Sequence, residues 1–411
     1  MSSVCFYFQV HQPFRVKKYR IFDVGHDHDY FNDYGHNSLS NEKIFKKVMN
    51  KCYLPTNAVM LELLKKHPQF KISYSISGVA MEQMEMYAPE VIESFQKLVN
   101  TGRVELLSET YYHSLSFLFS KSEFERQILL HKQKVKKLFD YEPKVFRNTE
   151  LIFNNELAHT IESMGFDGIL AEGVDRILDW RSPNFLYTPV SCNKIKLLLK
   201  NYRLSDDIAF RFSSREWSEW PLTAPKFSQW VNAVNGNGEI INLFMDYETF
   251  GEHQWDDTGI FNFLKALPGE ILKHPDNDFV TPTEAVKRFH SVGELDFHHF
   301  VSWADTERDL SAWLSNPMQH DAIRQVYDIE EKVLATEDED LIHDWRKLQT
   351  SDHFYYMCTK WFADGDVHKY FSPYETPYDA FIVVMYALHD LKLRVRNHKK
   401  WKKHSVQSSA I

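Results

Sequence analysis

The strongest constraint on the fold is a series of seven short, continuously apolar segments that recur along the chain. They cover residues 4–10, 71–76, 103–107, 144–147, 168–171, 195–199 and 240–245. Continuous hydrophobicity is typical of parallel strands, which are buried on both faces of their sheet. Segments with helical periodicity lie between several of them, at residues 57–66, 88–100, 122–139 and 155–164. This alternation predicts an α/β fold built from repeated strand–helix units.

The last part of the chain has a different pattern. After about residue 290, the segments 307–313, 318–334, 339–350 and 378–396 all have the spacing expected of helices. We therefore predict two domains, a catalytic strand–helix domain over residues 1–290 and an α-helical domain over residues 291–411.

Composition limits the classes of partner. The formal net charge is −9, and the one basic run, residues 392–403, is predicted to be a solvated tail, so we expect no nucleic-acid partner. No apolar stretch is long enough to span a membrane. The four cysteines show no metal-binding spacing, and the N-terminus lacks the features of a signal peptide. We predict a cytoplasmic protein with reduced thiols; the sequence does not reveal its oligomeric state.

Polar residues follow the predicted strands at their carboxyl ends. Glu150 comes shortly after the segment 144–147, and Asp246 directly follows the segment 240–245. In a barrel of parallel strands these ends meet on one face, which is where active sites are found. Two carboxylates held at one barrel mouth are the minimum equipment for cleaving a glycosidic bond.

Five short motifs are spread over most of the chain. They are HQP at 11–13, GRVELL at 102–107, FRNTEL at 146–151, MDYETFG at 245–251 and DLSAWL at 309–314. In this order they resemble glycoside hydrolase family 57, and most closely its α-amylase-like group. The resemblance implies an incomplete (β/α)7 TIM-like barrel followed by a C-terminal α-helical domain. It also implies that Glu150 is the nucleophile and Asp246 the proton donor.

The function implied by this resemblance is retaining hydrolysis of α-1,4-glucan by double displacement, with an α-glucan or maltooligosaccharide as substrate and no cofactor. Two alternatives stay open. The same site in a 4-α-glucanotransferase or branching-type enzyme would pass the glycosyl group to a sugar hydroxyl instead of water. A non-catalytic glucan-binding protein could also have this fold, although this chain keeps both carboxylates.

Further residues are candidates for substrate binding. His11, at the end of the first strand, could bond a sugar hydroxyl. Glu105 lies inside a strand and could bond sugar, or equally form a structural ion pair. His253 and Trp255 follow the loop of Asp246 and are candidates for lining the cleft. Trp303 and Trp313 are candidates for aromatic walls contributed by the C-terminal part, because aromatic rings stack on sugar faces.

A metal site is the remaining alternative. Residues 25–29, with the sequence GHDHD, and His36 lie in the long loop Phe22–Asn41, which is long enough to be either functional or mobile. The sequence does not reveal whether this loop closes the cleft. However, His11 is followed by Gln12 and Pro13, which are poor metal ligands. We predict no catalytic metal.

Overall fold

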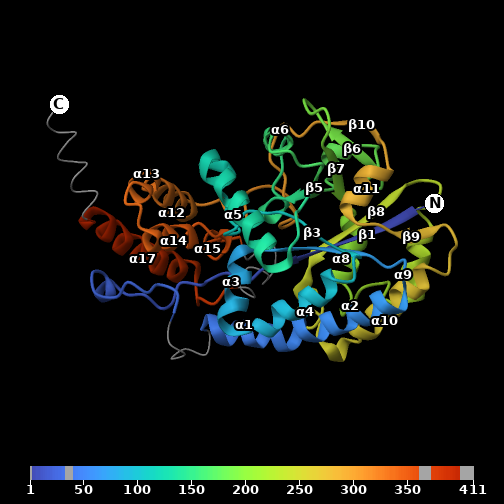
Figure 1. Cartoon of the computed structure of the whole chain (residues 1–411), viewed down its shortest axis with the longest axis horizontal. Coiled ribbons are helices and arrows are strands. Elements are labelled where there is room, and N and C mark those ends of the chain that lie inside the picture. The colour runs from blue at the N-terminus through green and yellow to red at the C-terminus, as the bar shows by residue number, and fades with distance from the viewer. Residues whose placement is uncertain (1, 33–39, 361–371, 399–411) are drawn as a thin grey trace. The chain divides into compact units, whose positions relative to one another are not determined.

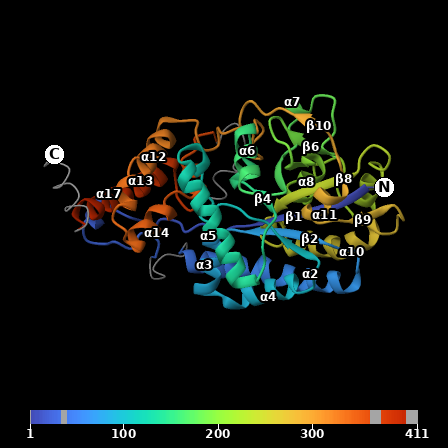
Figure 2. The ribbon, with the colours of Figure 1, turned by 45° about the horizontal axis from the view of Figure 1, so that its top comes forward.

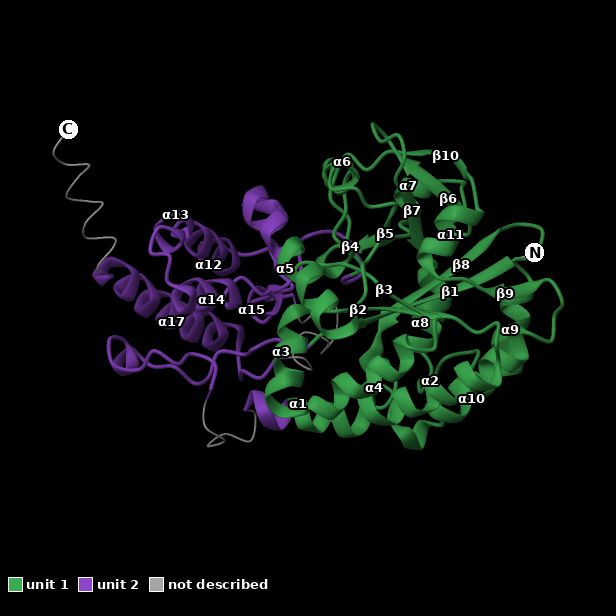
Figure 3. Ribbon diagram, viewed as in Figure 1, with its two compact units in different colours: residues 1–11, 45–110, 128–303 green, residues 12–44, 111–127, 304–411 purple. Residues whose placement is uncertain are grey.

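The computed structural model describes residues 2–32, 40–360 and 372–398. The chain forms two compact units (Figure 3). The first contains residues 1–11, 45–110 and 128–303, and the second contains residues 12–44, 111–127 and 304–411. The predicted domains were continuous in sequence, whereas each of these units gathers three chain segments.

All seven predicted strands are present in the first unit (Figure 1). They are β1 (Ser2–Val10), β2 (Ile72–Ile76), β3 (Val104–Leu106), β4 (Val145–Arg147), β5 (Gly168–Glu172), β7 (Lys196–Lys200) and β8 (Ile240–Asp246). Three further strands were not predicted: β6 (Leu186–Pro189), β9 (Asn277–Phe279) and β10 (Ser291–Leu295). These three are short, and β10 is largely exposed, so they lack a continuous apolar signal.

The strands form two sheets that meet at two seams. One sheet has the order β3-β2-β1-β8, with β9 also paired to β1, and the other has the order β10-β6-β7-β5-β4. At the first seam, Arg147 N–H donates to the Ser108 carbonyl over 2.9 Å. At the second, Asn201 N–H donates to the Asn242 carbonyl over 2.9 Å. The seven predicted strands therefore enclose an interior, but the ladder is interrupted twice, which makes an incomplete barrel.

Helices cover the outside of the barrel. α2 (Leu54–Lys66), α4 (Pro89–Val99) and α10 (Ile260–Ile271) lie along the outer side of β1, β2 and β8 in both views (Figures 1 and 2). The four helices predicted in this region are confirmed by α2, α4, α5 (Lys121–Phe139) and α6 (Asn155–Ser163). The other helices with residues in this unit are α1 (Asn41–Val48), α3 (Gly78–Tyr87), α7 (Asp175–Leu178), α8 (Tyr202–Ala209), α9 (Ala224–Asn232) and α11 (Pro282–Arg288).

The second unit is largely helical. Its C-terminal segment contains α12 (Pro317–Tyr327), α13 (Glu330–Leu334), α14 (Glu339–Lys347), α15 (Ser351–Tyr355) and α17 (Pro377–Asn397). The helix predicted at 318–334 is divided between α12 and α13. No helix of the described residues is both long and apolar enough to cross a membrane.

The prediction of a helix at residues 307–313 is wrong. This segment consists of turns, with Asp305 and Arg308 at positive φ. The Asp309 carboxylate accepts bonds from both the backbone N–H and the hydroxyl of Ser311. Such local side-chain bonds compete with helical backbone bonds, which explains why the apolar spacing did not produce a helix.

Candidate active site

The barrel interior is apolar in its middle layer. Tyr7 of β1 and Phe244 of β8 make an edge-to-face contact, with ring centres 5.5 Å apart. They share one buried cluster with Val145 of β4, Leu170 of β5 and Leu198 of β7. These residues therefore mark the inward faces of β1, β4, β5, β7 and β8.

Seven polar residues follow this layer at the carboxyl ends of the strands. Side chains two positions apart on a strand share a face, so the residues after the apolar layer also point inward. The register supports this, because Gln9 pairs with both Ser75 and Asp246, and Glu172 pairs with Lys200. We call this set the polar ring; it consists of Gln9, Ser75, Glu109, Arg147, Glu172, Lys200 and Asp246.

One side of the polar ring is a continuous hydrogen-bond network. The Tyr7 hydroxyl donates to Gln9 Oε1 over 2.8 Å and contacts Ser75 Oγ at 2.7 Å. Gln9 Nε2 donates to Glu109 Oε1 over 3.1 Å. His131, which is fully buried, supports this side because its Nδ1 accepts from the Glu109 backbone N–H. Burial lowers the pKa of His131, so the imidazole is neutral at neutral pH.

The other side of the polar ring contains a buried ion-pair cluster. Lys200 Nζ lies 2.9 Å from an Asp206 carboxylate oxygen and 3.5 Å from a Glu172 carboxylate oxygen. Glu172 is fully buried, and it also accepts a bond from the Gly173 backbone N–H. Two carboxylates therefore neutralise the charge of Lys200.

Glu150 lies just beyond the end of β4 in a strained turn. Its φ is 57° and that of Leu151 is 50°, so two successive residues other than glycine adopt left-handed conformations. One such residue costs about 1–3 kcal/mol and persists only where its surroundings fix it. Here the surroundings are the segment 301–303, because Phe153 and Val301 exchange two backbone bonds of 2.9 Å.

Trp303 contacts Glu150 twice. Its backbone N–H donates to the Glu150 carbonyl over 3.2 Å, and its indole Nε1–H donates to Glu150 Oε2 over 2.7 Å. Two cations approach the indole ring. The guanidinium carbon of Arg147 lies 4.9 Å from the ring centre, and Lys200 Nζ lies 5.5 Å from it. The carboxylate of Glu150 is thus hydrogen-bonded to an indole whose ring contacts the cations Arg147 and Lys200.

Asp246 has a more regular setting. It is the last residue of β8, with φ −66° and ψ 140°, and it is half-buried. The pKa of the neighbouring Tyr7 is raised, mainly by burial; the charge of Arg147 acts in the opposite direction, and the charges of Glu109 and Asp246 add to the rise. Glu248, two residues further on, does not join the polar ring, because it is nearly buried and accepts a hydrogen bond from Tyr53.

Two predicted histidines lie on the segments that follow β1 and β8. His11 is half-buried, and its Nδ1 lies 2.7 Å from the hydroxyl of Ser77, the N-cap residue of α3. His253 belongs to the loop after Asp246, where its backbone N–H donates to the Glu248 backbone carbonyl over 2.9 Å. Desolvation lowers the pKa of His253 to about 4, so the ring is neutral at neutral pH.

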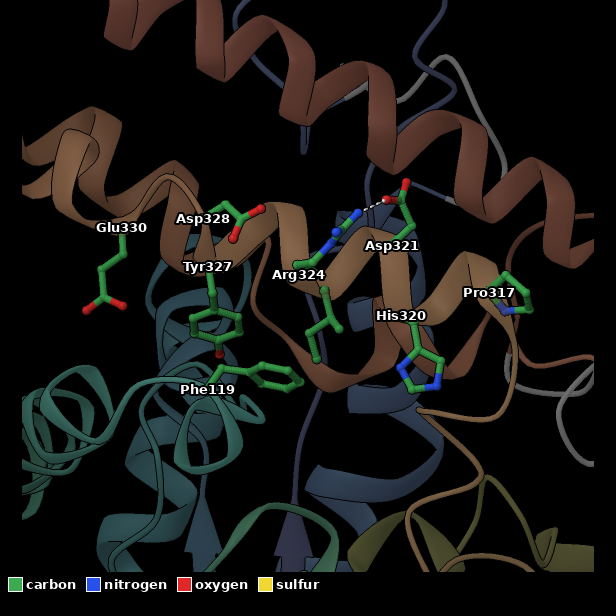
Figure 4. Close-up of a pocket in the computed structure, with 9 residues that line it drawn as sticks. Phe119, Pro317, His320, Asp321, Arg324, Tyr327, Asp328 and Glu330 are labelled. Atoms are coloured by element: carbon green, nitrogen blue, oxygen red, sulfur yellow. Dashed lines mark hydrogen bonds and ion pairs between the residues drawn. The ribbon is translucent and has the colours of Figure 1, made fainter.

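Trp255 lines a separate groove of the first unit. Its side chain is 55% exposed, and Lys51 Nζ lies 4.9 Å from its ring centre. This groove, of about 660 Å³, contains no member of the polar ring. A second groove, of about 690 Å³, lies along α12 in the second unit, where the rings of Phe119 and Tyr327 stack (Figure 4). It contains none of the predicted site residues.

The structure gives two other predicted residues structural partners. Glu105 accepts bonds from the backbone N–H and the hydroxyl of Thr283, at the N-terminus of α11. Burial raises the pKa of Glu105, and the Thr283 bonds act in the opposite direction. Trp313 is only 1% exposed and packs on Tyr355 inside the second unit.

The histidine-rich loop uses its described side chains in other contacts. His28 Nδ1 lies 2.8 Å from the carboxylate of Asp390, and Asp27 accepts a bond from Lys17 over 2.7 Å. His36 lies outside the described residues. Both contacts occur within the second unit and give His28 and Asp27 different partners.

The most informative residue that sequence analysis missed is Arg147. It is fully buried, and none of its three guanidinium nitrogens has a hydrogen-bond partner among the residues described. Glu109, Glu172 and Lys200 were visible only as polar residues after strands. One signal identifies all four. Side chains alternate between the two faces of a strand, so the residue two positions after the last inward apolar side chain also points inward.

Comparison with known proteins identifies the family of this chain. Residues 5–298 match the family Glycosyl hydrolase family 57, and the chain belongs to that family of glycoside hydrolases. A Methanocaldococcus jannaschii protein whose name proposes it to be an alpha-amylase is 43% identical over 404 residues, covering 96% of this chain and 85% of that protein.

Two solved structures share the fold. The first, a GH57 branching enzyme from Thermococcus kodakaraensis, has a TM-score of 0.70 at 13% identity and covers 96% of this chain and 90% of its own. The second, the alpha-amylase AmyC from Thermotoga maritima, has a TM-score of 0.60 at 12% identity and covers 99% of this chain and 94% of its own. At these identities the likeness concerns the fold, and it agrees with the predicted barrel and helical parts.

Proposed function

We propose that this glycoside hydrolase cleaves α-1,4-linked glucan with retention of configuration, using Glu150 as nucleophile and Asp246 as general acid/base. The observation that carries the proposal is the placement of the two carboxylates. Both lie at carboxyl ends of strands in the same barrel, Glu150 three residues after β4 and Asp246 at the end of β8. The name of the Methanocaldococcus jannaschii relative favours an α-glucan or maltooligosaccharide as substrate.

The chemistry proceeds in two displacements. In the first, a Glu150 oxygen forms a bond to the anomeric carbon while the bond to the leaving oxygen breaks, and Asp246 gives its proton to that oxygen. In the second, Asp246 takes a proton from water, the water oxygen bonds to the anomeric carbon, and the ester to Glu150 breaks. Asp246 ends with its proton and Glu150 ends as a carboxylate, so the site is restored. This geometry requires the carboxyl groups to be about 5–5.5 Å apart.

The surroundings of the two residues support these roles. The nucleophile must be ionised, and Glu150 accepts a bond from the indole N–H of Trp303 beside Arg147 and Lys200. Hydrogen bonds and positive charge both favour an ionised carboxyl group. His11, at the end of β1, is proposed to bond a sugar hydroxyl. His253 and Trp255 remain candidates for more distant sugar contacts, whereas the contacts of Glu105 and Trp313 favour structural roles.

The test is incubation of the pure protein with maltoheptaose, followed by chromatography of the products and NMR of their first-formed anomer. The proposal predicts shorter products with the α-configuration. Appearance of the β-anomer first would contradict retention. Absence of turnover with detectable glucan binding would instead favour a non-catalytic glucan-binding protein.

A transferase is the second candidate, because the barrel and helical parts share their fold with a GH57 branching enzyme over 96% of the chain. The chemistry differs only in the acceptor, since a sugar hydroxyl replaces water in the second displacement. Products longer than maltoheptaose, or newly formed branch points, would favour transfer over hydrolysis.

We also propose a cytoplasmic location, supported by four cysteines that are all buried and unpaired.

A further inference from the structure

Trp303 holds Glu150 through both its backbone and its side chain. The backbone bond fixes the strained turn, and the indole bond of 2.7 Å fixes the carboxylate at Oε2. The two residues are 153 positions apart in the chain. A contact of this kind controls the direction of a carboxylate more tightly than a solvent bond can, because both partners are held by the fold.

We propose that Trp303 is a positioning residue for the nucleophile, and that the buried guanidinium of Arg147 holds the indole and supplies positive charge beside it. The inference rests on the proposed role of Glu150 as nucleophile. It assigns to Trp303 a task different from that of an aromatic wall for sugar rings.

The ring contacts of Trp303 support this assignment. Two cations approach its ring, Arg147 at 4.9 Å and Lys200 at 5.5 Å, so charged groups of the barrel hold the indole in place. Cations are attracted to indole faces more strongly when they are shielded from water. A nearby cation also draws electron density from the ring, which strengthens the indole N–H as a donor to Glu150.

The two cations differ in how they are neutralised. Lys200 is paired with Asp206 and Glu172. Arg147 is fully buried, and among the described residues its guanidinium nitrogens have no hydrogen-bond partner. Its charge is therefore the less compensated of the two. Such a charge favours the ionised form of a nearby carboxylate, which is the form needed both to attack and to leave.

Arg147 is not placed to bind substrate directly. Its polar nitrogens are sealed from solvent. An anionic ligand is also unfavourable here, because the polar ring and Glu150 together contain two more carboxylates than cations. The guanidinium is consequently suited to act on Glu150 through Trp303.

The first test uses matched variants with maltoheptaose as substrate. Trp303→Phe keeps an aromatic ring but removes the indole N–H; we expect kcat to fall about 10- to 100-fold, the range of one charge-assisted hydrogen bond, with little change in KM. The acidic limb of the kcat/KM profile should move to higher pH, because Glu150 becomes easier to protonate. Arg147→Met should move the limb in the same direction, and Arg147→Lys should partly restore it.

Trp230→Phe is the control, because Trp230 lies on α9 and contacts Trp217 and Phe227. It should leave both the rate and the pH profile unchanged. If Trp303→Phe keeps kcat within about twofold and only raises KM, Trp303 is a sugar wall and the proposal is overturned.

The second test does not need turnover. The chain has 10 tryptophans, so indole ¹⁵N labelling gives a small set of Nε1–H resonances, and Trp303→Phe identifies the one from Trp303. We expect this resonance to shift in Glu150→Gln and to titrate with pH only when Glu150 is present. A resonance insensitive to Glu150 would overturn the positioning role even in an active enzyme. A sensitive resonance in a protein that does not cleave glucan would refute the proposed function instead and leave the contact established.

Discussion

The carboxyl ends of β4 and β8 are each followed or closed by one candidate catalytic carboxylate, but the two local structures differ. Glu150 follows β4 in a left-handed turn that a segment 153 residues away holds in place. Asp246 ends β8 in an ordinary extended conformation and pairs in register with Gln9. Around Glu150 lie an indole N–H and two cations, whereas the Gln9 side of the polar ring contains the carboxylate of Glu109.

This difference shows how two carboxylic acids in one barrel can be suited to two roles, nucleophile and acid/base. Positive charge and a directed donor favour a carboxylate that stays ionised, which a nucleophile requires. A half-buried carboxyl group is better suited to exchanging a proton, because partial desolvation favours its neutral form. The roles that we propose follow this difference, with Glu150 as nucleophile and Asp246 as acid/base.

The largest expected effect comes from removing either carboxylate. Glu150→Gln and Asp246→Asn should each lower kcat by at least about 10³-fold with the fold intact.

To separate their roles, Glu150→Ala and Asp246→Ala are supplied with azide and an α-glycosyl fluoride. Azide should replace the missing nucleophile in Glu150→Ala and give a β-glycosyl azide. In Asp246→Ala it should attack the glycosyl-enzyme and give an α-glycosyl azide. The same anomer from both variants would contradict the assignment.

The two cations beside Trp303 should differ in their effect on stability. Lys200→Met leaves the buried Glu172 without its ion-pair partner and should reduce the free energy of unfolding by about 3–5 kcal/mol. The double variant Lys200→Met/Glu172→Gln should recover part of this loss. Arg147→Met removes a buried charge without hydrogen-bond partners and should leave stability unchanged or raised. Urea denaturation measures all three; equal losses for Lys200→Met and Arg147→Met would refute the distinction.

The loop after Asp246 should make folding sensitive to acid through His253. Its pKa in the folded protein is about 4, below the unfolded value of about 6.5. As pH falls through this window the unfolded chain gains a proton that the folded chain does not, so stability is lost by at most about 3 kcal/mol. His253→Gln should make this dependence shallower. The exposed His320→Gln is the control, and an equal change in both variants would exclude His253 as the source.

The smallest effect is expected for Trp255. It lies in a groove that contains no member of the polar ring, so Trp255→Ala should change kcat/KM for short maltooligosaccharides by less than about twofold. A larger effect on long glucans than on maltotriose would show that this groove extends the substrate-binding surface. A large loss with maltotriose itself would place Trp255 at the cleavage site.

Much of the barrel could be predicted from the sequence because its signal is local. Each of the seven strands is a short apolar run; Asp246 directly follows one of these runs, and Glu150 comes three residues after the end of another. The polar ring was less visible, because it depends on which strand residues face inward. Arg147 was the hardest to recognise, since a basic residue at the end of an apolar run has no special sequence signature.

Contacts between distant segments account for the rest. The bond from Trp303 to Glu150 joins residues 153 positions apart, and Glu105 reaches Thr283 across 178 positions. Sequence spacing contains no information about either pairing. The helix predicted at residues 307–313 failed for a different, local reason: the bonds of Ser311 to the Asp309 carboxylate favour turns.

The most direct test of the central claim is to trap the covalent intermediate with a 5-fluoro-α-glucosyl fluoride and to map the labelled peptide by mass spectrometry. The trapped sugar should be attached to Glu150, and label should accumulate faster than it is released. Label on any other residue, or turnover of the reagent with an inverted product and no covalent species, would contradict the account.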